Sequence, residues 1–224
     1  VVSEMAKNKT GKKKIVVASI LAALVMQAGV VTVEAAGDRP TGTIEGGRLG
    51  QGGLTNGLAI GNDAVSGSHQ SIAIGYRALA SSQYADPAQP AVAIGAGASA
   101  SGRGGVSLGL IANSNVRGTA IGSATKATGF GTFAGGTFAE ATNAGDVAIG
   151  GASSDRFDDY AVASGGYSVA IGTAAKADGS AAVSIGYKTN AKTSNSVAVG
   201  SESKATGEGA VAVGRKNTST GASS

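Results

Sequence analysis

The side chains best suited to binding chemistry lie mainly in two short segments, 81–90 (SSQYADPAQP) and 150–166 (GGASSDRFDDYAVASGG). Aromatic residues make up only 4% of the whole chain, so their presence in these segments is notable. Aromatic and arginine side chains are the usual anchors of protein interfaces. We therefore predict that the two segments bind a partner. The candidate residues are Tyr84, Asp86, Gln89, Arg156, Phe157, Asp158 and Tyr160.

A weaker role stays open for these segments, because such residues can also pack back onto the fold or be tolerated without a partner. The run DRFDD at 155–159 fits calcium poorly, since calcium loops need several oxygen ligands at set spacings. His69 is the sole histidine, and the chain has no cysteine for thiol chemistry or metal binding. The sequence also lacks the GxxxxGK(S/T) phosphate loop. We therefore predict no catalytic residue, metal, cofactor or small-molecule substrate.

The two segments interrupt a short sequence repeat, so the structure formed by that repeat must hold them in position. A phrase of small and apolar residues, such as SVAIG at 168–172, recurs along the chain and ends in glycine. Successive closing glycines are 14, 20, 14, 13, 13, 15, 22, 14, 14 and 14 residues apart. A period near 14 predicts a solenoid, and the two long intervals are insertions that leave it as loops. The closing glycines are Gly61, Gly75, Gly95, Gly109, Gly122, Gly135, Gly150, Gly172, Gly186, Gly200 and Gly214.

Each repeat predicts two short strands and two turns. In SVAVG at 196–200, branched residues alternate with a small one, which is the period of a strand, and glycine favours a tight turn. The segment KATG, at 126–129 and 204–207, predicts the return strand. We expect residues 57–221 to form an all-β parallel solenoid of eleven coils, about 50 Å long at the usual strand spacing. Residues 37–56 are predicted to form a lead-in or cap.

The strand phrase is apolar on both faces, with valine and isoleucine on one side and alanine on the other. A strand with one face in water alternates apolar with polar residues instead. One face is therefore expected to pack inside its own coil and the other against something else. Repeated eleven times, an uncovered face would form a large apolar patch. We predict a homo-oligomer whose number of chains this pattern does not give.

Positive charge is concentrated near the start of the chain. Residues 1–36 hold five lysines and two glutamates, so they carry +3 of the total net charge of +4. The rest of the chain then carries only +1. A nucleic-acid binder needs a basic face in its folded part. We therefore predict no nucleic-acid partner.

The first 36 residues have the three parts of a secretory signal peptide. A lysine cluster at 7–14 precedes the uncharged apolar run 15–33, and small residues follow it. We predict cleavage after Ala35 or Ala36 and export of the mature protein. A membrane anchor is the alternative, because the apolar run approaches the length that spans a bilayer.

The phrases NSVAVG, SVAIG and KATG resemble the head repeats of YadA-like trimeric autotransporter adhesins. The resemblance extends over about residues 57–221. It implies a left-handed parallel β-roll, assembled as a homotrimer and displayed on the bacterial outer membrane as a virulence-associated adhesin. It also implies a host matrix or cell-surface receptor as partner. Such proteins continue into a stalk and a membrane anchor, so residues 222–224 are expected to begin a downstream region.

Two other functions compete with the adhesin. A hexapeptide-repeat acyltransferase is also a trimeric β-helix, but its coils are longer, being built from three hexapeptides, and it uses a catalytic histidine. The period near 14 and the isolated position of His69 argue against that enzyme. A passive spacer that holds another domain away from the cell agrees with the uniform coils of 168–221, and only the two insertions favour binding over it.

Overall fold

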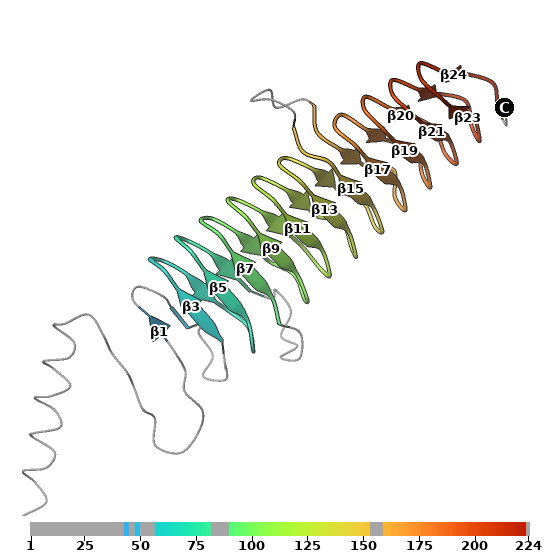
Figure 1. The fold of residues 1–224 in the computed structure, drawn as a ribbon. Coiled ribbons are helices and arrows are strands. Elements are labelled where there is room, and N and C mark those ends of the chain that lie inside the picture. The colour runs from blue at the N-terminus through green and yellow to red at the C-terminus, as the bar shows by residue number, and fades with distance from the viewer. Residues whose placement is uncertain (1–42, 45–47, 50–56, 82–89, 153–158, 223–224) are drawn as a thin grey trace, which may run out of the picture.

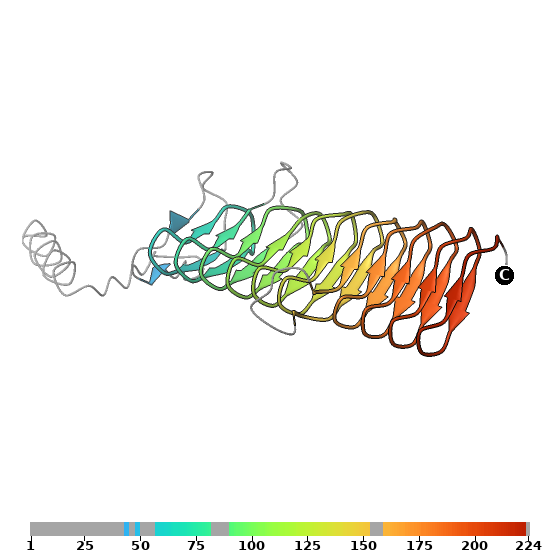
Figure 2. The ribbon, with the colours of Figure 1, turned by 90° about the horizontal axis from the view of Figure 1, so that it is seen from above.

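The computed structural model describes residues 43–44, 48–49, 57–81, 90–152 and 159–222. These residues form two 12-stranded sheets in which every pairing between neighbours is parallel. The coils stack along one axis from the N-terminal to the C-terminal end of the described chain (Figures 1 and 2). The predicted all-β solenoid, with two short strands in each repeat, is therefore confirmed. The structure adds that one of the two strands is regularly longer than the other.

One sheet, here called the long-strand sheet, collects the valine- and isoleucine-rich phrases. Its strands are three residues long, except for the first. In order they are β1 (Thr43–Ile44), β3 (Leu58–Ile60), β5 (Ile72–Ile74), β7 (Val92–Ile94), β9 (Val106–Leu108), β11 (Thr119–Ile121), β13 (Phe133–Gly135), β15 (Val147–Ile149), β17 (Val169–Ile171), β19 (Val183–Ile185), β21 (Val197–Val199) and β23 (Val211–Val213).

The other sheet, here called the short-strand sheet, collects the return segments, each two residues long. β1 and β2 extend the two sheets by one strand each, within the stretch predicted as a lead-in. The short strands are β2 (Arg48–Leu49), β4 (Val65–Ser66), β6 (Leu79–Ala80), β8 (Ser99–Ala100), β10 (Asn113–Ser114), β12 (Lys126–Ala127), β14 (Glu140–Ala141), β16 (Val162–Ala163), β18 (Lys176–Ala177), β20 (Asn190–Ala191), β22 (Lys204–Ala205) and β24 (Thr218–Ser219).

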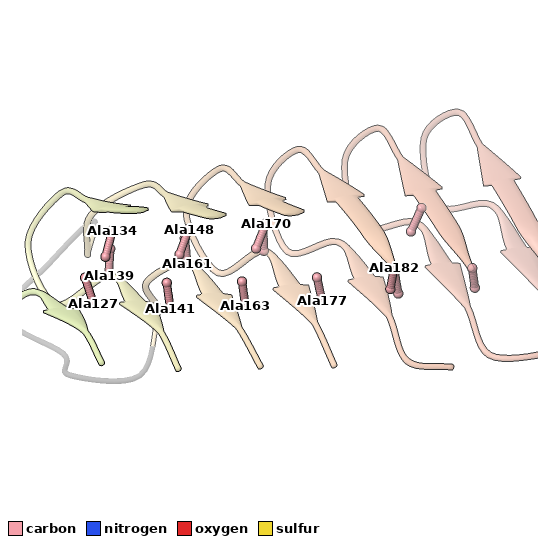
Figure 3. Close-up of a cluster of buried hydrophobic side chains, with 14 of the residues drawn as sticks. Ala127, Ala134, Ala139, Ala141, Ala148, Ala161, Ala163, Ala170, Ala177 and Ala182 are labelled. Atoms are coloured by element: carbon pink, nitrogen blue, oxygen red, sulfur yellow. The ribbon is translucent and has the colours of Figure 1, made fainter. Parts of the chain in front are cut away.

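The core between the sheets is built almost wholly from alanine. Figure 3 shows Ala134, Ala148 and Ala170 of the long strands facing Ala141 and Ala163 of the short strands. All of these side chains are fully buried. Because a methyl group takes little room, the two backbones lie close together, and every buried apolar side chain inside the described part of the roll is an alanine. The small residue at the centre of each phrase is thus the one that points inward.

Serine and threonine replace alanine at some inward positions and are hydrogen-bonded there. Ser184 Oγ lies 2.8 Å from Thr189 Oγ1, which in turn donates to the Gly186 carbonyl at 3.0 Å. Ser107 Oγ donates to the Ser99 carbonyl at 2.7 Å. Buried polar groups of this kind add no unpaired donor or acceptor, so the alanine core tolerates them.

The glycine that ends each long strand is required by both conformation and space. Gly172 has φ +124°, and a Cβ there would lie 2.5 Å from the Gly186 carbonyl oxygen in the next coil. One predicted register is wrong. In the pair Gly135–Gly136, Gly135 pairs with Ile121 and Ile149 inside the sheet, whereas Gly136 has φ +115° and stacks on Gly122. With Gly136 as the closing glycine, the intervals on its two sides both equal the regular period.

The two insertions do not interrupt the stacking. β5 pairs directly with β7 across the first one, and β15 pairs with β17 across the second. The first follows a short strand, β6, whereas the second follows a long strand, β15. The described residues that flank them therefore place the two insertions at opposite edges of the roll.

Candidate binding surfaces

Six of the seven predicted binding residues lie outside the described residues: Tyr84, Asp86, Gln89, Arg156, Phe157 and Asp158. The seventh, Tyr160, is half-buried at the end of the second insertion. Its ring centre lies 6.2 Å from that of Phe138, with the rings tilted by 41°. Tyr160 thus packs against an earlier coil, and the binding role of all seven residues stays a prediction.

The outward face of the long-strand sheet, here called the long-strand face, is apolar at nearly every coil, with Thr119 and Gly135 as exceptions in β11 and β13. Along it the first and third residues of each strand pair in register with those of the next, as Val169 does with Val183 and Ile171 with Ile185. Each single chain leaves these two columns partly open to water. Exposed fractions reach 37–60% at Ile94, Ile121, Ile149, Ile185, Val211 and Val213.

The outward face of the short-strand sheet, here called the short-strand face, is polar and varied. Its column reads Val65, Leu79, Ser99, Asn113, Lys126, Glu140, Val162, Lys176, Asn190, Lys204 and Thr218. Lys126 Nζ lies 2.6 Å from Glu140 Oε1. This hydrogen bond raises the pKa of Lys126 above its usual value, since it favours the charged ammonium.

Exposed aromatic rings in the turns carry cations over their faces. The Arg77 guanidinium lies 4.9 Å from the ring centre of Tyr76, and that of Arg117 lies 5.4 Å from the ring of Phe130 in the following coil. Such contacts are worth about 0.5–1 kcal/mol at exposed sites. They hold long side chains against the turns and display both aromatic and cationic groups at the edges of the roll.

Nothing in the described part of the chain forms a metal centre, because no three histidine, cysteine, aspartate or glutamate side chains gather there. Within the same residues, no helix has the length and apolar character needed to cross a membrane. The predicted signal peptide, 1–36, lies outside the described residues.

The comparison with known families decides the relationship that the repeat phrases suggest. The YadA head domain repeat matches residues 55–82, 88–110, 163–189, 177–203, 194–217 and 205–224, which together amount to half of the chain. The chain belongs to the YadA head family. YadA heads are structural adhesin domains that tip surface fibres, and the predicted resemblance is confirmed. No individual curated protein matches the chain.

One cluster on the short-strand face was missed by sequence reasoning. Lys176, Asn190 and Lys204 are each separated by one period of the repeat and therefore lie side by side on adjacent coils. The period alone could have revealed this, had the residues of each return strand been aligned by their position in the coil. Lys176 and Lys204 are also the first residues of the repeat phrases KADG and KATG. They were therefore interpreted as part of the repeat and not as a surface cluster.

Proposed function

We propose that this protein is the head of a homotrimeric surface adhesin that binds a host extracellular-matrix or cell-surface receptor protein. The long-strand face carries the proposal. Its two apolar columns run the length of the roll and stay partly exposed in a single chain. Soluble proteins rarely leave so extended an apolar surface open to water. Three copies packed by this face around a common axis would cover it.

The family supports both parts of this proposal, because YadA-type heads form trimers and act in adhesion. A homotrimer also explains why the phrase repeats so faithfully. In such an assembly each coil meets equivalent coils of two other chains, so every coil needs the same outward side chains. Export through the signal peptide 1–36 and display on the outer membrane complete the proposal.

The receptor site is proposed at the two insertions. Loops on a rigid scaffold are where binding residues concentrate. The flanking strands pair across both insertions, so the stacking of the coils does not depend on the inserted residues. Trimerisation would also display three copies of each, and several weak contacts together give strong attachment.

Deletion of each insertion tests the receptor site. Removing six residues within 82–89, or eight within 151–158, restores a coil of the regular length. We expect one deletion to abolish binding of the protein to immobilised collagen, fibronectin or host cells while its mass and β-sheet circular dichroism stay unchanged. The other deletion then serves as the matched control.

A passive spacer is the alternative function, favoured by the unbroken coils of 168–221. The two functions differ in the outcome of the same assay. An intact head that binds neither matrix proteins nor host cells would contradict the adhesin proposal. Binding that survives both deletions would retain the adhesin but move its receptor site onto the coils.

A further inference from the structure

A groove lies beside the short strands in the C-terminal part of the roll and is lined by residues of the coils around β20; Figure 1 labels that strand. It has a volume of about 350 Å³ and is bordered by three lysines from three successive coils. Ala174 is the smallest side chain of its lining and fills little of the space between the longer ones. The lining residues are Asp159, Ala174, Lys176, Lys188, Thr189, Asn190 and Lys204.

The stacking of coils fixes how the cations are spaced. Lys176 pairs in register with Asn190, and Asn190 pairs with Lys204, so the two lysines lie two coils apart on one outward column. Two strand spacings separate them by about 10 Å along the axis of the rod. Lys188 borders the same groove from the adjoining turn. The positive charges therefore follow the rod rather than cluster at one point.

Ion pairs elsewhere on the roll show what sets these lysines apart. Lys126 is paired with Glu140 at 2.6 Å, and Lys216 Nζ lies 3.9 Å from Glu202 Oε2. Among the described residues, neither Lys176 nor Lys204 has a carboxylate within 4.0 Å. Both side chains are exposed, so they are available to an anion from solution.

The remaining charged groups of the groove, Lys188 and Asp159, leave its net charge positive. Lys188 lies with its ammonium 5.0 Å from the ring centre of Tyr187. A hydrogen bond to the Tyr187 side chain raises the pKa of Lys188 above its usual value. Like the other two lysines, Lys188 is positively charged at neutral pH. Asp159 contributes one negative charge to the lining, against three positive charges from the lysines.

An unpaired acceptor in the groove narrows the chemistry of the ligand. Asn190 is half-buried at the groove, and its Oδ1 is turned away from solvent, where no hydrogen-bond donor in the described part of the chain reaches it. A buried acceptor without a partner is costly, so rotation of the Asn190 side chain toward a ligand that supplies a donor is favoured. A simple anion has no donor to offer. A molecule that carries both anionic groups and hydroxyl or N–H donors satisfies the lysines and Asn190 together.

The lining also argues against a protein side chain as the anchor of such a contact. Protein interfaces depend on aromatic or large aliphatic residues in desolvated pockets. Ala174 is the largest purely aliphatic side chain that lines this groove. Charge complementarity and hydrogen bonding, rather than apolar contact, must therefore hold the ligand.

From this geometry we propose that the groove binds a linear, sulfated acidic polysaccharide, whose chain lies along the rod. Its sulfate or carboxylate groups contact Lys176, Lys188 and Lys204, and a sugar hydroxyl or amide donates to Asn190 Oδ1 once that side chain turns toward the groove. The groove flanks the sheet opposite the long-strand face, so a trimer joined by that face leaves three grooves open. The inference rests on the proposed function, because it assumes the trimer joined by the long-strand face. It adds a carbohydrate as a second class of partner.

Heparin is the probe for this site. We expect the purified protein to bind immobilised heparin, with an affinity that falls as salt is raised because the contacts are exposed. Replacing Lys176, Lys188 and Lys204 together by glutamine should weaken binding at least about tenfold, the equivalent of one charge-assisted hydrogen bond. Asn190→Ala, which leaves the net charge unchanged, should weaken it about fivefold.

The matched control removes the same number of charges elsewhere. Glutamine at Lys126, Lys192 and Lys216 lowers the net charge equally but leaves the groove intact. We expect that variant to lose less than about threefold in affinity, since exposed charges outside a contact act weakly. Circular dichroism and thermal unfolding of both triple variants confirm that the fold is unchanged, as all six side chains are exposed.

Three outcomes would overturn the proposal. They are an absence of heparin binding, equal losses in the two triple variants, or binding of polyglutamate as tight as that of heparin. The last would assign the groove to an acidic peptide. Adhesion to matrix proteins that persists without heparin binding would reject this inference and leave the adhesin function standing. Heparin binding by a head that attaches to no receptor protein would support this inference and reject the proposed binding of a receptor protein.

Discussion

The two outward faces of the roll differ sharply, although the same coils build both. Ten of the strands in the long-strand sheet begin with valine, isoleucine, leucine or phenylalanine, and most end with a branched apolar side chain. On the short-strand face, neighbouring coils carry unlike residues, such as Lys126 beside Glu140 and Lys176 beside Asn190. The inward positions are small in both sheets.

This difference distinguishes the residues that folding of a coil requires from the residues that are set by what the coil contacts on its outside. Both sheets need small inward residues, because they share one thin alanine core. Folding of a single chain does not require valine or isoleucine to face water. Their regular recurrence on one face indicates that the face has the same neighbour at every coil, and the variety of the other face indicates solvent or a local partner.

The largest effect is expected from a charge placed on the long-strand face. Val169→Lys puts an ammonium in the proposed trimer interface, where an unpaired buried charge costs about 3–5 kcal/mol for each copy. Val162→Lys is the matched control, because Val162 is the same residue on the short-strand face and is equally half-buried. Light scattering should show that Val169→Lys dissociates the assembly and Val162→Lys does not. Equal behaviour of the two variants would remove the distinction between the faces.

A second comparison concerns glycines at the two kinds of turn. Gly172→Ala, after a long strand, forces a Cβ to within 2.5 Å of a carbonyl oxygen at φ +124°. We expect a loss of about 3 kcal/mol or more from combined strain and overlap. Gly131→Ala, after a short strand, meets nothing within 4 Å at φ +64° and should cost about 1 kcal/mol. Urea unfolding measures both, and similar losses would contradict the packing described at the long-strand glycines.

A third prediction concerns Asp146, in the coil before the second insertion. Asp146 stands directly before the long strand, where the next two coils have a small residue, Ser168 and Ala182. Buried Asp146 accepts hydrogen bonds from Asn143 N at 2.9 Å, Ser168 N at 2.9 Å and Ser168 Oγ at 2.8 Å. It thus ties together the coils on either side of the insertion. Asp146→Ala should cost about 2–3 kcal/mol, because buried donors lose their partner.

Ser196→Ala is the control for that prediction. Ser196 occupies the same position three coils further on, and alanine stands there in the coils on either side, at Ala182 and Ala210. Its replacement should therefore cost less than about 1 kcal/mol. Thermal unfolding compares the two variants, and a loss at Ser196 as large as at Asp146 would show that Asp146 has no special role.

The smallest effect is expected on the short-strand face itself. Lys126→Met breaks the exposed ion pair with Glu140 and should cost about 0.5 kcal/mol at neutral pH. Because the pKa of Lys126 is raised in the fold, this stabilisation is fully present below pH 10.5 and is lost as pH rises through the higher folded value. Lys176→Met, without such a pair, should show no comparable pH-dependent loss. Unfolding curves at neutral and strongly alkaline pH test this contrast.

The coil was predictable from the sequence because every coil has the same requirements. It needs small residues where the two sheets face each other and glycine where the chain turns. The strand periods, the turn glycines and the insertions could all be recognised in phrases such as SVAIG. The register at Gly135–Gly136 could not, since either glycine fits the phrase and only stacking on Gly122 distinguishes them.

The candidate sites were less predictable, because they depend on contacts between coils. Lys176 and Lys204 are two periods apart in sequence but border one groove. Tyr160 was predicted from its residue type, whereas its packing depends on Phe138 of an earlier coil. The bond from Ser168 to Asp146 likewise spans an insertion whose length hides the regular spacing.

The central claim is that copies of the same chain cover the long-strand face. Its most direct test is the mass of the purified protein in solution, measured by light scattering on a gel-filtration column. We predict a mass of three chains, each of 21.3 kDa for the full sequence and less if the predicted signal peptide is removed. A stable, soluble monomer would contradict the claim, because the two apolar columns of the long-strand face would then lie open to water without penalty.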